Sequence, residues 1–144
     1  MKIAFIFCLL VTSEIIAAQV PYVNAKRSYE ESLTDAKRNG MVLSHGTELA
    51  KPNESITSTF LLNPRKTYTV LFLGPSSITS FDIEYGLNNQ SPQQVSGAKK
   101  LPDGSKCIVF TVNAGEANRL KVKRKVEGIE SPQFTWYIIT EWKQ

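Results

Sequence analysis

The sequence predicts an all-β fold, an antiparallel, jelly-roll-like β-sandwich of about seven to eight strands over residues 41–144. Beyond Gly40, apolar and polar residues alternate in short runs, as they do in half-buried strands. Turn residues separate these runs about every 8–12 residues, the spacing typical of sandwiches and barrels. Helical patterns, which a parallel α/β fold would need between its strands, are missing from this part of the chain.

Residues 1–25 are interpreted as a signal peptide. Lys2 supplies a positive start, residues 3–11 are apolar throughout, and small residues follow at Ala17-Ala18 and at Ala25. We therefore expect cleavage after Ala18 or after Ala25, and a secreted or periplasmic product. A buried N-terminal helix or strand is the alternative interpretation. Since no uninterrupted apolar run reaches about 18 residues, a transmembrane helix is not expected.

A short helix is predicted over residues 26–40. Ser28 and Glu31 have the spacing of a capping box, in which each side chain pairs with a backbone amide of the first turn. Tyr29, Leu33 and Ala36 fall on one stripe, and Gly40 is a suitable stop. Because about three turns are marginal alone, this helix must pack against something.

The strands follow from the alternating pattern. The residue between Tyr68 and Val70 is polar, but residues 70–73 are all apolar, which predicts a central strand buried on both faces. Asp103-Gly104 predicts a tight turn. The predicted strands are residues 56–62, 68–73, 81–85, 107–112, 120–125 and 134–139, with a further short strand around residues 94–96.

Two features of the predicted core bear on function. With the signal peptide removed, Cys107 would be the remaining cysteine, so it cannot form an intramolecular disulfide, and its apolar surroundings predict a core residue. Trp136 is expected to face the core with Phe134 and Ile138. The alternative is that Trp136, Tyr137 and Trp142 form an aromatic platform for a sugar.

One stretch carries a family resemblance. Residues 58–74 contain an apolar strand, a turn and a second strand with Tyr68, Val70 and Phe72; strands at 81–85, 120–122 and 135–140 follow. This pattern resembles the bacterial pre-peptidase C-terminal type of jelly-roll module in exported proteins, a sandwich that certain small periplasmic lysozyme inhibitors share. The resemblance implies a non-catalytic module that binds, spaces or inhibits.

The sequence offers few candidate residues for catalysis or metal binding. His45 is the one histidine, and no nucleophile motif stands beside it. Asp82 and Glu84 lie on one face of a strand, where a calcium site or a catalytic carboxylate pair could form, but no Asp-rich loop supplies the further oxygens that calcium needs. We therefore expect a solvated strand face, no cofactor, no metal and no enzymatic activity.

The net charge of +4 comes entirely from residues 99–144, which hold nine basic and five acidic residues. Lys121, Lys123 and Lys125 project from one strand face, and such a row attracts anions. With Lys99 and Lys100 they are the candidate binding residues, for an anionic glycan or a protein partner. The alternative is an edge strand that its lysines protect from aggregation. Nucleic acid is not an expected ligand.

Two functions are therefore predicted. The first is a small exported binding or inhibitor module that uses its basic strand face. The second is a structural or accessory subunit of a cell-envelope complex that docks through the N-terminal helix.

Overall fold

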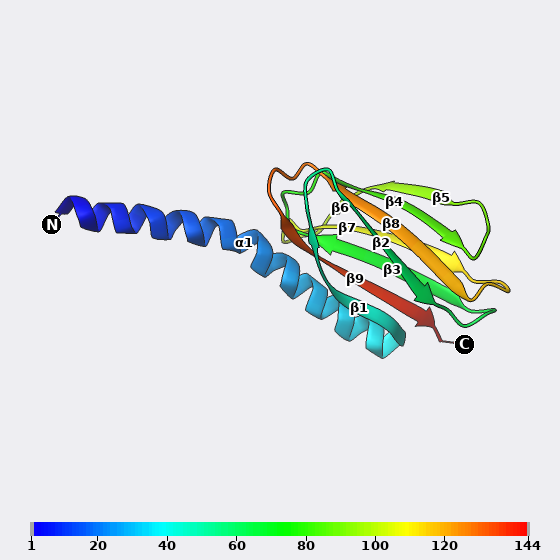
Figure 1. Cartoon of the computed structure of the whole chain (residues 1–144). Helices are drawn as coiled ribbons and strands as arrows, with labels where there is room; N and C mark the ends of the chain where they lie inside the picture. Colours follow the sequence, from blue (N-terminus) through cyan, green and yellow to red (C-terminus); the bar gives the residue numbers. More distant parts are fainter. Residues whose placement is uncertain (1, 144) are drawn as a thin grey trace.

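The protein is a two-sheet β-sandwich with one long helix on its outer side (Figure 1). The computed structural model describes the backbone of residues 2–143 and the side chains of residues 20–143. In the described chain, sheet A has the strand order β1-β9-β3-β7-β6 and sheet B the order β2-β8-β4-β5, and all neighbouring strands are antiparallel. The elements are α1 (Lys2–Asn39), β1 (Gly40–Ala50), β2 (Ser55–Leu61), β3 (Thr67–Gly74), β4 (Ser80–Leu87), β5 (Gln93–Gly97), β6 (Lys99–Lys100), β7 (Lys106–Asn113), β8 (Arg119–Glu127) and β9 (Gln133–Trp142).

The predicted sandwich is thus confirmed, with nine strands instead of seven to eight. The two additional strands are β1 and β6. β1 is an edge strand that pairs with β9 through a register shift between Val42 and Ser44. Its central residues, Ser44 to Thr47, are polar or glycine, so the apolar alternation that marks the other strands is interrupted there. β6 has two residues, too few for any periodicity to show.

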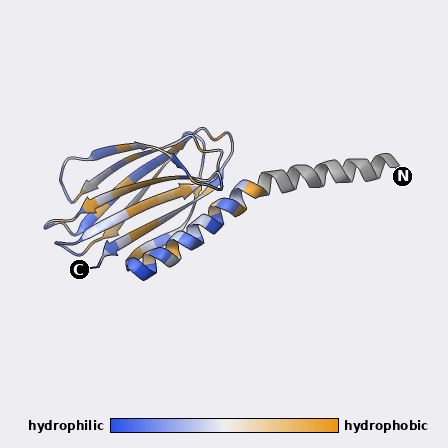
Figure 2. Cartoon of the chain, turned by 180° about the vertical axis from the view of Figure 1, so that it is seen from behind, coloured by the Kyte–Doolittle hydropathy of each residue, from blue (hydrophilic) through white to orange (hydrophobic). Residues whose placement is uncertain are grey.

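β3 lies at the centre of sheet A, between β9 and β7, as its two apolar faces predict. Tyr68, Val70 and Phe72 point between the sheets and are at most 1% exposed. Opposite them, sheet B contributes side chains such as Ile83 and Val122, both fully buried. Figure 2 shows hydrophobic residues gathered along the strands and a mixture of hydrophilic and hydrophobic residues along the described part of α1. Burial of these apolar side chains is the main stabilising term of the sandwich.

The helix is longer than predicted. α1 spans Lys2–Asn39, so the expectation of a short helix over residues 26–40 is wrong at its start and right at its end to within one residue. Ala17, Ala18 and Ala25, which suggested a cleavage region, are also strong helix formers, and the helix continues through Pro21 between them. The signal peptide remains a prediction, and the side chains of residues 1–19 lie outside the described part.

Around Ala25 and Tyr29, α1 covers part of the outer face of sheet A and creates a second small core. Ala25, Leu73, Cys107 and Trp136 form a buried cluster, each at most 5% exposed. The core position predicted for Cys107 is confirmed, and burial raises the pKa of its thiol. Trp136 is buried as predicted, but beneath the helix and not between the sheets. The prediction fails for Phe134, which is 47% exposed on the same outer face.

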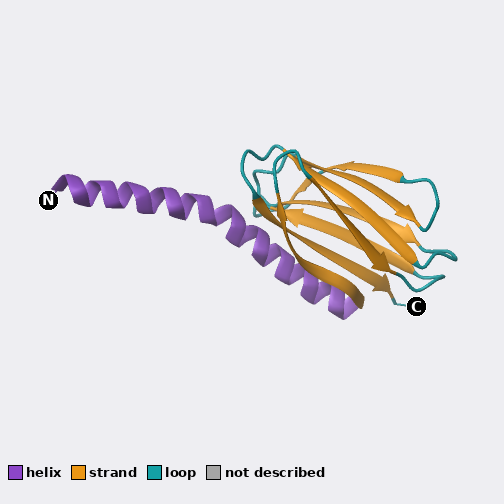
Figure 3. Cartoon of the chain, viewed as in Figure 1, coloured by secondary structure: helices purple, strands orange, loops and turns teal. Residues whose placement is uncertain are grey.

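α1 passes into β1 without a loop (Figure 3). Gly40 stands at this joint, where a Cβ would lie 2.5 Å from the carbonyl oxygen of Glu141 and 2.7 Å from Cγ2 of Thr140. The backbones approach so closely that only glycine fits. Nearby, the Lys143 ammonium donates to the carbonyl of Arg38 at 2.9 Å, satisfying one of the free carbonyls in the last helical turn.

Candidate functional site

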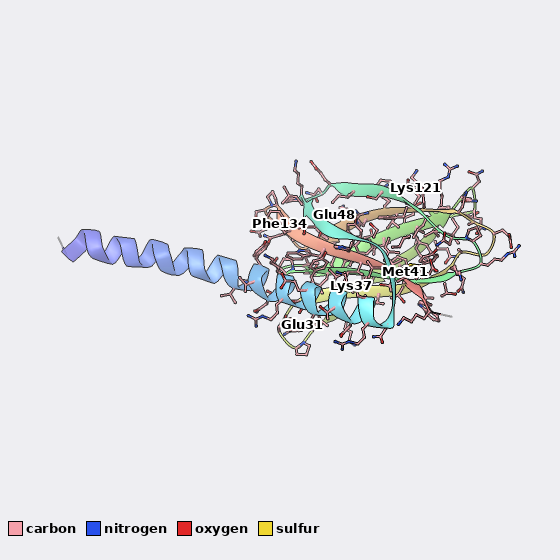
Figure 4. The ribbon with its side chains drawn as sticks, turned by 90° about the horizontal axis from the view of Figure 1, so that it is seen from below. Glu31, Lys37, Met41, Glu48, Lys121 and Phe134 are labelled. Carbon is pink, nitrogen blue, oxygen red and sulfur yellow. The ribbon has the colours of Figure 1, made fainter. Side chains whose placement is uncertain are left out.

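The candidate site is the outer face of sheet B, where the predicted basic row is found. Along β8, buried residues alternate with Arg119, Lys121, Lys123 and Lys125, of which the first three are exposed and the last half-exposed. The four side chains therefore share one solvent-facing side of the strand. We call them the basic row. Figure 4 places Lys121 on the side of the sandwich away from α1.

β8 is a central strand, paired with β2 on one side and with β4 on the other. The alternative interpretation, in which lysines protect an edge strand, is therefore wrong. The sequence could not reveal this because strand order depends on contacts between distant segments. Since the row lies in the middle of an open sheet face, an approaching ligand meets it directly.

The neighbouring strands give the basic row a charge gradient. In the register of β4 with β8, Asp82 stands opposite Lys125 and Glu84 opposite Lys123. Opposite charges at such positions partly neutralise each other. Lys121 faces Gly86 on β4 and Thr59 on β2, so no carboxylate stands directly across from it. The positive potential is therefore concentrated toward the Arg119 end of the strand.

A hollow flanks this uncompensated end. Lys121 and Arg119 line a depression of about 190 Å³ together with Thr59, Asn88 and Asn89. On the other side of Lys121, a second depression of about 400 Å³ runs along the turn between β4 and β5. Cations, a hydroxyl and amides line the first depression, and such groups bind anionic oxygens by charge-assisted hydrogen bonds. The second depression also has the carboxylate of Glu84 in its lining, so the first suits an anion better.

Asn88 fixes the wall of this hollow. It adopts a positive φ of 48°, which asparagine tolerates better than most residues. Its side-chain oxygen accepts hydrogen bonds from the backbone amides of Asn118 at 3.2 Å and Arg119 at 3.0 Å. The turn that follows β4 is thereby tied to the start of β8, next to Lys121.

Lys99 and Lys100 do not join the basic row. They form β6, at the edge of sheet A, and pair with Cys107 and Lys106 of β7. Both are exposed and flank another side of the sandwich. The five candidate lysines thus separate into a group of three on sheet B and a group of two on sheet A.

Arg124 lies between Lys123 and Lys125 in the sequence of β8, but its side chain points into the sandwich. It is 4% exposed and lies between the sheets, where its Nε donates to Glu48 Oε2 at 2.6 Å and its Nη2 to Ser58 Oγ at 3.2 Å. Its guanidinium also lies over the rings of Phe72 and Tyr137. Burial lowers the pKa of Arg124 to about 10, so the group is still protonated at neutral pH. Strand alternation alone would have placed it inward.

The candidate catalytic groups do not meet. His45 lies on β1 of sheet A, where its Nδ1 is 2.6 Å from the hydroxyl of Tyr29 on α1. Asp82 and Glu84 lie on the outer face of sheet B, across the whole sandwich. Burial, with smaller effects of Tyr137 and Glu30, raises the pKa of Tyr29, which keeps its hydroxyl protonated. The His45–Tyr29 contact therefore connects helix and sheet.

Two further properties concern the described residues. Within them, no group of three or more His, Cys, Asp or Glu side chains is placed to hold a metal ion. In the same part of the chain, no helix is both long and apolar enough to cross a membrane.

Comparison with known proteins supports the fold. No family model and no curated protein matches this sequence. Among solved structures, the pre-peptidase C-terminal domain of a Bacillus anthracis collagenase is 6% identical over 69% of this chain and 90% of that domain, with a TM-score of 0.50. The propeptide form of the Bacillus licheniformis lipase BlEst2 is 14% identical with a TM-score of 0.52, over 69% of this chain but only 22% of the lipase.

A third structure, PliG, a periplasmic inhibitor of g-type lysozyme from Aeromonas hydrophila, is 12% identical over 72% of this chain and 89% of the inhibitor, with a TM-score of 0.46. At such identities, the property shared with the collagenase domain and the lipase is the fold. The chain therefore has the β-sandwich fold of pre-peptidase C-terminal modules, as its strand pattern predicts.

Proposed function

We propose that this protein is an exported, non-catalytic binding or inhibitor module that recognises an anionic glycan or an acidic protein surface through its basic row. The observation that carries the proposal is the position of Lys121 and Arg119 on a central strand of an open sheet, without a carboxylate directly opposite Lys121. A rigid antiparallel sheet holds these cations in fixed spacing, which favours a ligand with repeated negative groups.

The absence of a catalytic step in this proposal rests on geometry. Among the described residues, His45 and the two carboxylates of β4 face opposite sides of the molecule, whereas acid–base catalysis requires groups within hydrogen-bond reach of one substrate. The same sandwich fold occurs within a lipase and as a domain of a collagenase, so the fold alone would not decide the matter.

The test compares two charge reversals of equal size. The Arg119→Glu/Lys121→Glu variant changes the basic row, and Lys99→Glu/Lys100→Glu makes the same change in net charge on β6. Binding of both to polygalacturonate, to poly-L-glutamate and to vesicles containing phosphatidylglycerol is measured over a salt series. We expect the first variant to lose about tenfold in affinity and the second to stay near the wild type.

Three results would oppose this proposal. Salt-insensitive binding to all three probes would remove the electrostatic interaction, and no binding at all would remove the basic row as a site. Equal losses in the two variants would mean that net charge, not the basic row, attracts the ligand.

A second candidate function is a structural or accessory subunit that docks through α1. The observation that favours it is an exposed apolar patch where the described side chains of α1 begin: Val20, Val23, Phe134 and Leu49 are each 44–50% exposed. Tyr22 joins the two parts of the patch, since its ring lies 5.6 Å from that of Phe134. Partner recovery by a Val23→Glu/Phe134→Glu variant tests this function, because neither side chain belongs to the buried clusters.

A further inference from the structure

A groove separates the last turns of α1 from the outer face of sheet A. Its volume is about 550 Å³, within the range of sites that bind small molecules. Its floor comes from β3, β7 and β9, its roof from the helix, and one end from Trp142. It lies on the opposite side of the sandwich from the basic row, so it is a separate site (Figure 4).

The sequence of α1 explains why this space is unfilled. Side chains that face the sheet recur at positions 22, 25, 29, 32, 36 and 39, the three-and-four spacing of one helix face. Tyr22 and Tyr29 fill the first part of the interface, where both rings contact Trp136. The later positions hold small or polar residues, among them Ser32 and Ala36, which cannot reach the sheet below.

The floor of the groove stays apolar where the helix no longer covers it. Leu71 and Ile138 line it, and Val109 on β7 is 56% exposed. Val109 lies where β7 is paired with β3 but extends beyond the two-residue β6, and a β-branched side chain so exposed gains stability from any apolar group that covers it. The floor thus offers a flat apolar surface.

Trp142 closes one end in a fixed orientation. Its indole is 51% exposed, and its Nε1 donates to Oγ1 of Thr69 at 2.8 Å. This hydrogen bond uses the polar edge of the ring and leaves the remaining indole surface apolar. An aromatic ring held in this way can stack on the C–H face of a ligand.

The roof supplies hydrogen-bonding groups. Asp35 and Asn39 are four residues apart and therefore on one side of the helix, and Thr140 adds a hydroxyl from β9. The side chain of Asp35 is 69% exposed, and its ion pair with Arg38 is loose at 3.8 Å, so the carboxylate can accept hydrogen bonds from a ligand. A carboxylate beside an amide can pair with neighbouring hydroxyls.

We propose that this groove binds an uncharged saccharide segment. A sugar ring has C–H faces that suit the indole and the apolar floor, and hydroxyl edges that suit Asp35 and Asn39. An acyl chain filling the same space would remove water from these polar groups without replacing their hydrogen bonds, at a cost in free energy. The lining holds the carboxylate of Asp35 and the ammonium of Lys143, which already donates to the carbonyl of Arg38, so the charges nearly balance and favour an uncharged ligand.

The experiment titrates the full chain with maltotriose, cellotriose and chitotriose, following tryptophan emission and the heat of binding. Ala36→Phe fills the groove without removing a polar group, and Trp142→Ala removes the stacking surface. Lys51→Glu serves as control, since Lys51 is exposed and follows the end of β1 that lies away from Trp142. We expect saturable binding of at least one trisaccharide, a loss of about tenfold or more in both groove variants, and no change in the control. Circular dichroism establishes that the variants are folded.

Several outcomes would overturn the proposal. Saturation by none of the three sugars excludes an uncharged saccharide of this size, and binding that survives Ala36→Phe places the sugar elsewhere. Binding of dodecanoate that Ala36→Phe abolishes, with no sugar binding, would assign the groove to an acyl chain. Because Ala36→Phe and Trp142→Ala leave the basic row on sheet B untouched, failure here is distinguishable from failure of the basic row.

Discussion

Arg124 and Glu48 join the two sheets through a buried ion pair. One residue comes from β8 and the other from β1, and their side chains are 4% and 15% exposed. The guanidinium has a carboxylate, a hydroxyl and two aromatic faces around it, so its charge is well compensated. Such a pair adds little net stability compared with apolar residues, but it is costly to break from one side.

We therefore expect Glu48→Gln to lower the free energy of unfolding by about 3 kcal/mol, because Arg124 stays charged and loses its counterion. The Glu48→Leu/Arg124→Met double variant should cost less than the single one. Urea unfolding followed by circular dichroism measures both. A double variant whose loss of stability equals the sum of the losses in the Glu48→Leu and Arg124→Met single variants would show that the pair is not coupled.

For single residues, the sequence predicted the direction of a side chain wherever that direction follows from the alternation along its own strand. The alternation of β8 places the lysines outward and Arg124 inward, so both could be predicted. It could not predict that Asp82 and Glu84 stand beside those lysines, because register between strands 40 residues apart depends on the whole sheet. The sequence also could not predict that Trp142 lines a groove, because its neighbours there come from α1, β3 and β7.

At the scale of elements, α1 is held to the sandwich by polar contacts as well as by its aromatic residues. Ser28 Oγ donates to Asp103 Oδ2 at 2.6 Å, and Asn24 Nδ2 donates to the Asp103 carbonyl at 3.3 Å. The Asp103-Gly104 turn predicted from the sequence thus lies where the helix docks, and Gly104 has the positive φ of 91° that such a turn requires.

The docking of α1 should depend on acid pH. Burial alone would raise the pKa of Asp103, but hydrogen bonds from Ser28 and Ser105 outweigh it and lower the pKa below its ordinary value of 3.8. A carboxyl group with a lowered pKa in the folded state stabilises that state above its unfolded pKa, and the contribution disappears as pH falls through the folded pKa. We expect Trp136 emission to shift to the red below about pH 4. In Asp103→Asn this acid step should be absent; an unchanged step would point to other groups.

Cys107 can report on the position of the helix, because Ala25 and Trp136 cover it. Ala25→Glu places a carboxylate in this dry cluster and should release the helix, so that alkylation of the Cys107 peptide becomes about tenfold faster or more. Val23→Glu is the matched control, since Val23 is 46% exposed on the same helix. Mass spectrometry of that peptide avoids interference from Cys8. Equal rates in the two variants would mean that the helix does not protect Cys107.

The predictions for elements succeeded where periodicity was strong. Six alternating runs and the short run at 94–96 all became strands. The helix start was wrong because a signal peptide and a helix share the same apolar residues, and the sequence alone does not separate them. β1 was missed since an edge strand beside a helix needs no regular apolar face.

At the scale of the whole molecule, the two outer faces of the sandwich differ in character. Sheet B presents charge on an open surface, whereas sheet A is covered by α1 and keeps a groove beside it. The excess of basic residues in the last third of the sequence predicted the first face. The second arises only when the two ends of the chain come together, as α1 packs on β9.

If the chain is exported and cleaved, this arrangement favours cleavage after Ala18 over cleavage after Ala25. Tyr22, Asn24 and Ala25 contact the sandwich, and a cut after Ala25 would uncover Trp136. We expect the processed chain to begin at Gln19, which N-terminal sequencing of exported protein determines. A start at Lys26 would contradict this expectation.

The direct passage from α1 into β1 has a consequence for the rotational phase of the helix. Each added residue turns an α-helix by about 100°. No loop lies between α1 and β1, and the backbone at Gly40 is packed too closely against β9 to absorb such a rotation. A single alanine inserted between Asn39 and Gly40 would swing Tyr22 and Tyr29 off Trp136 and rotate a different stripe over the groove. The joint at Gly40 therefore fixes the rotation of α1 about its own axis, and with it the face of the helix that contacts the sandwich.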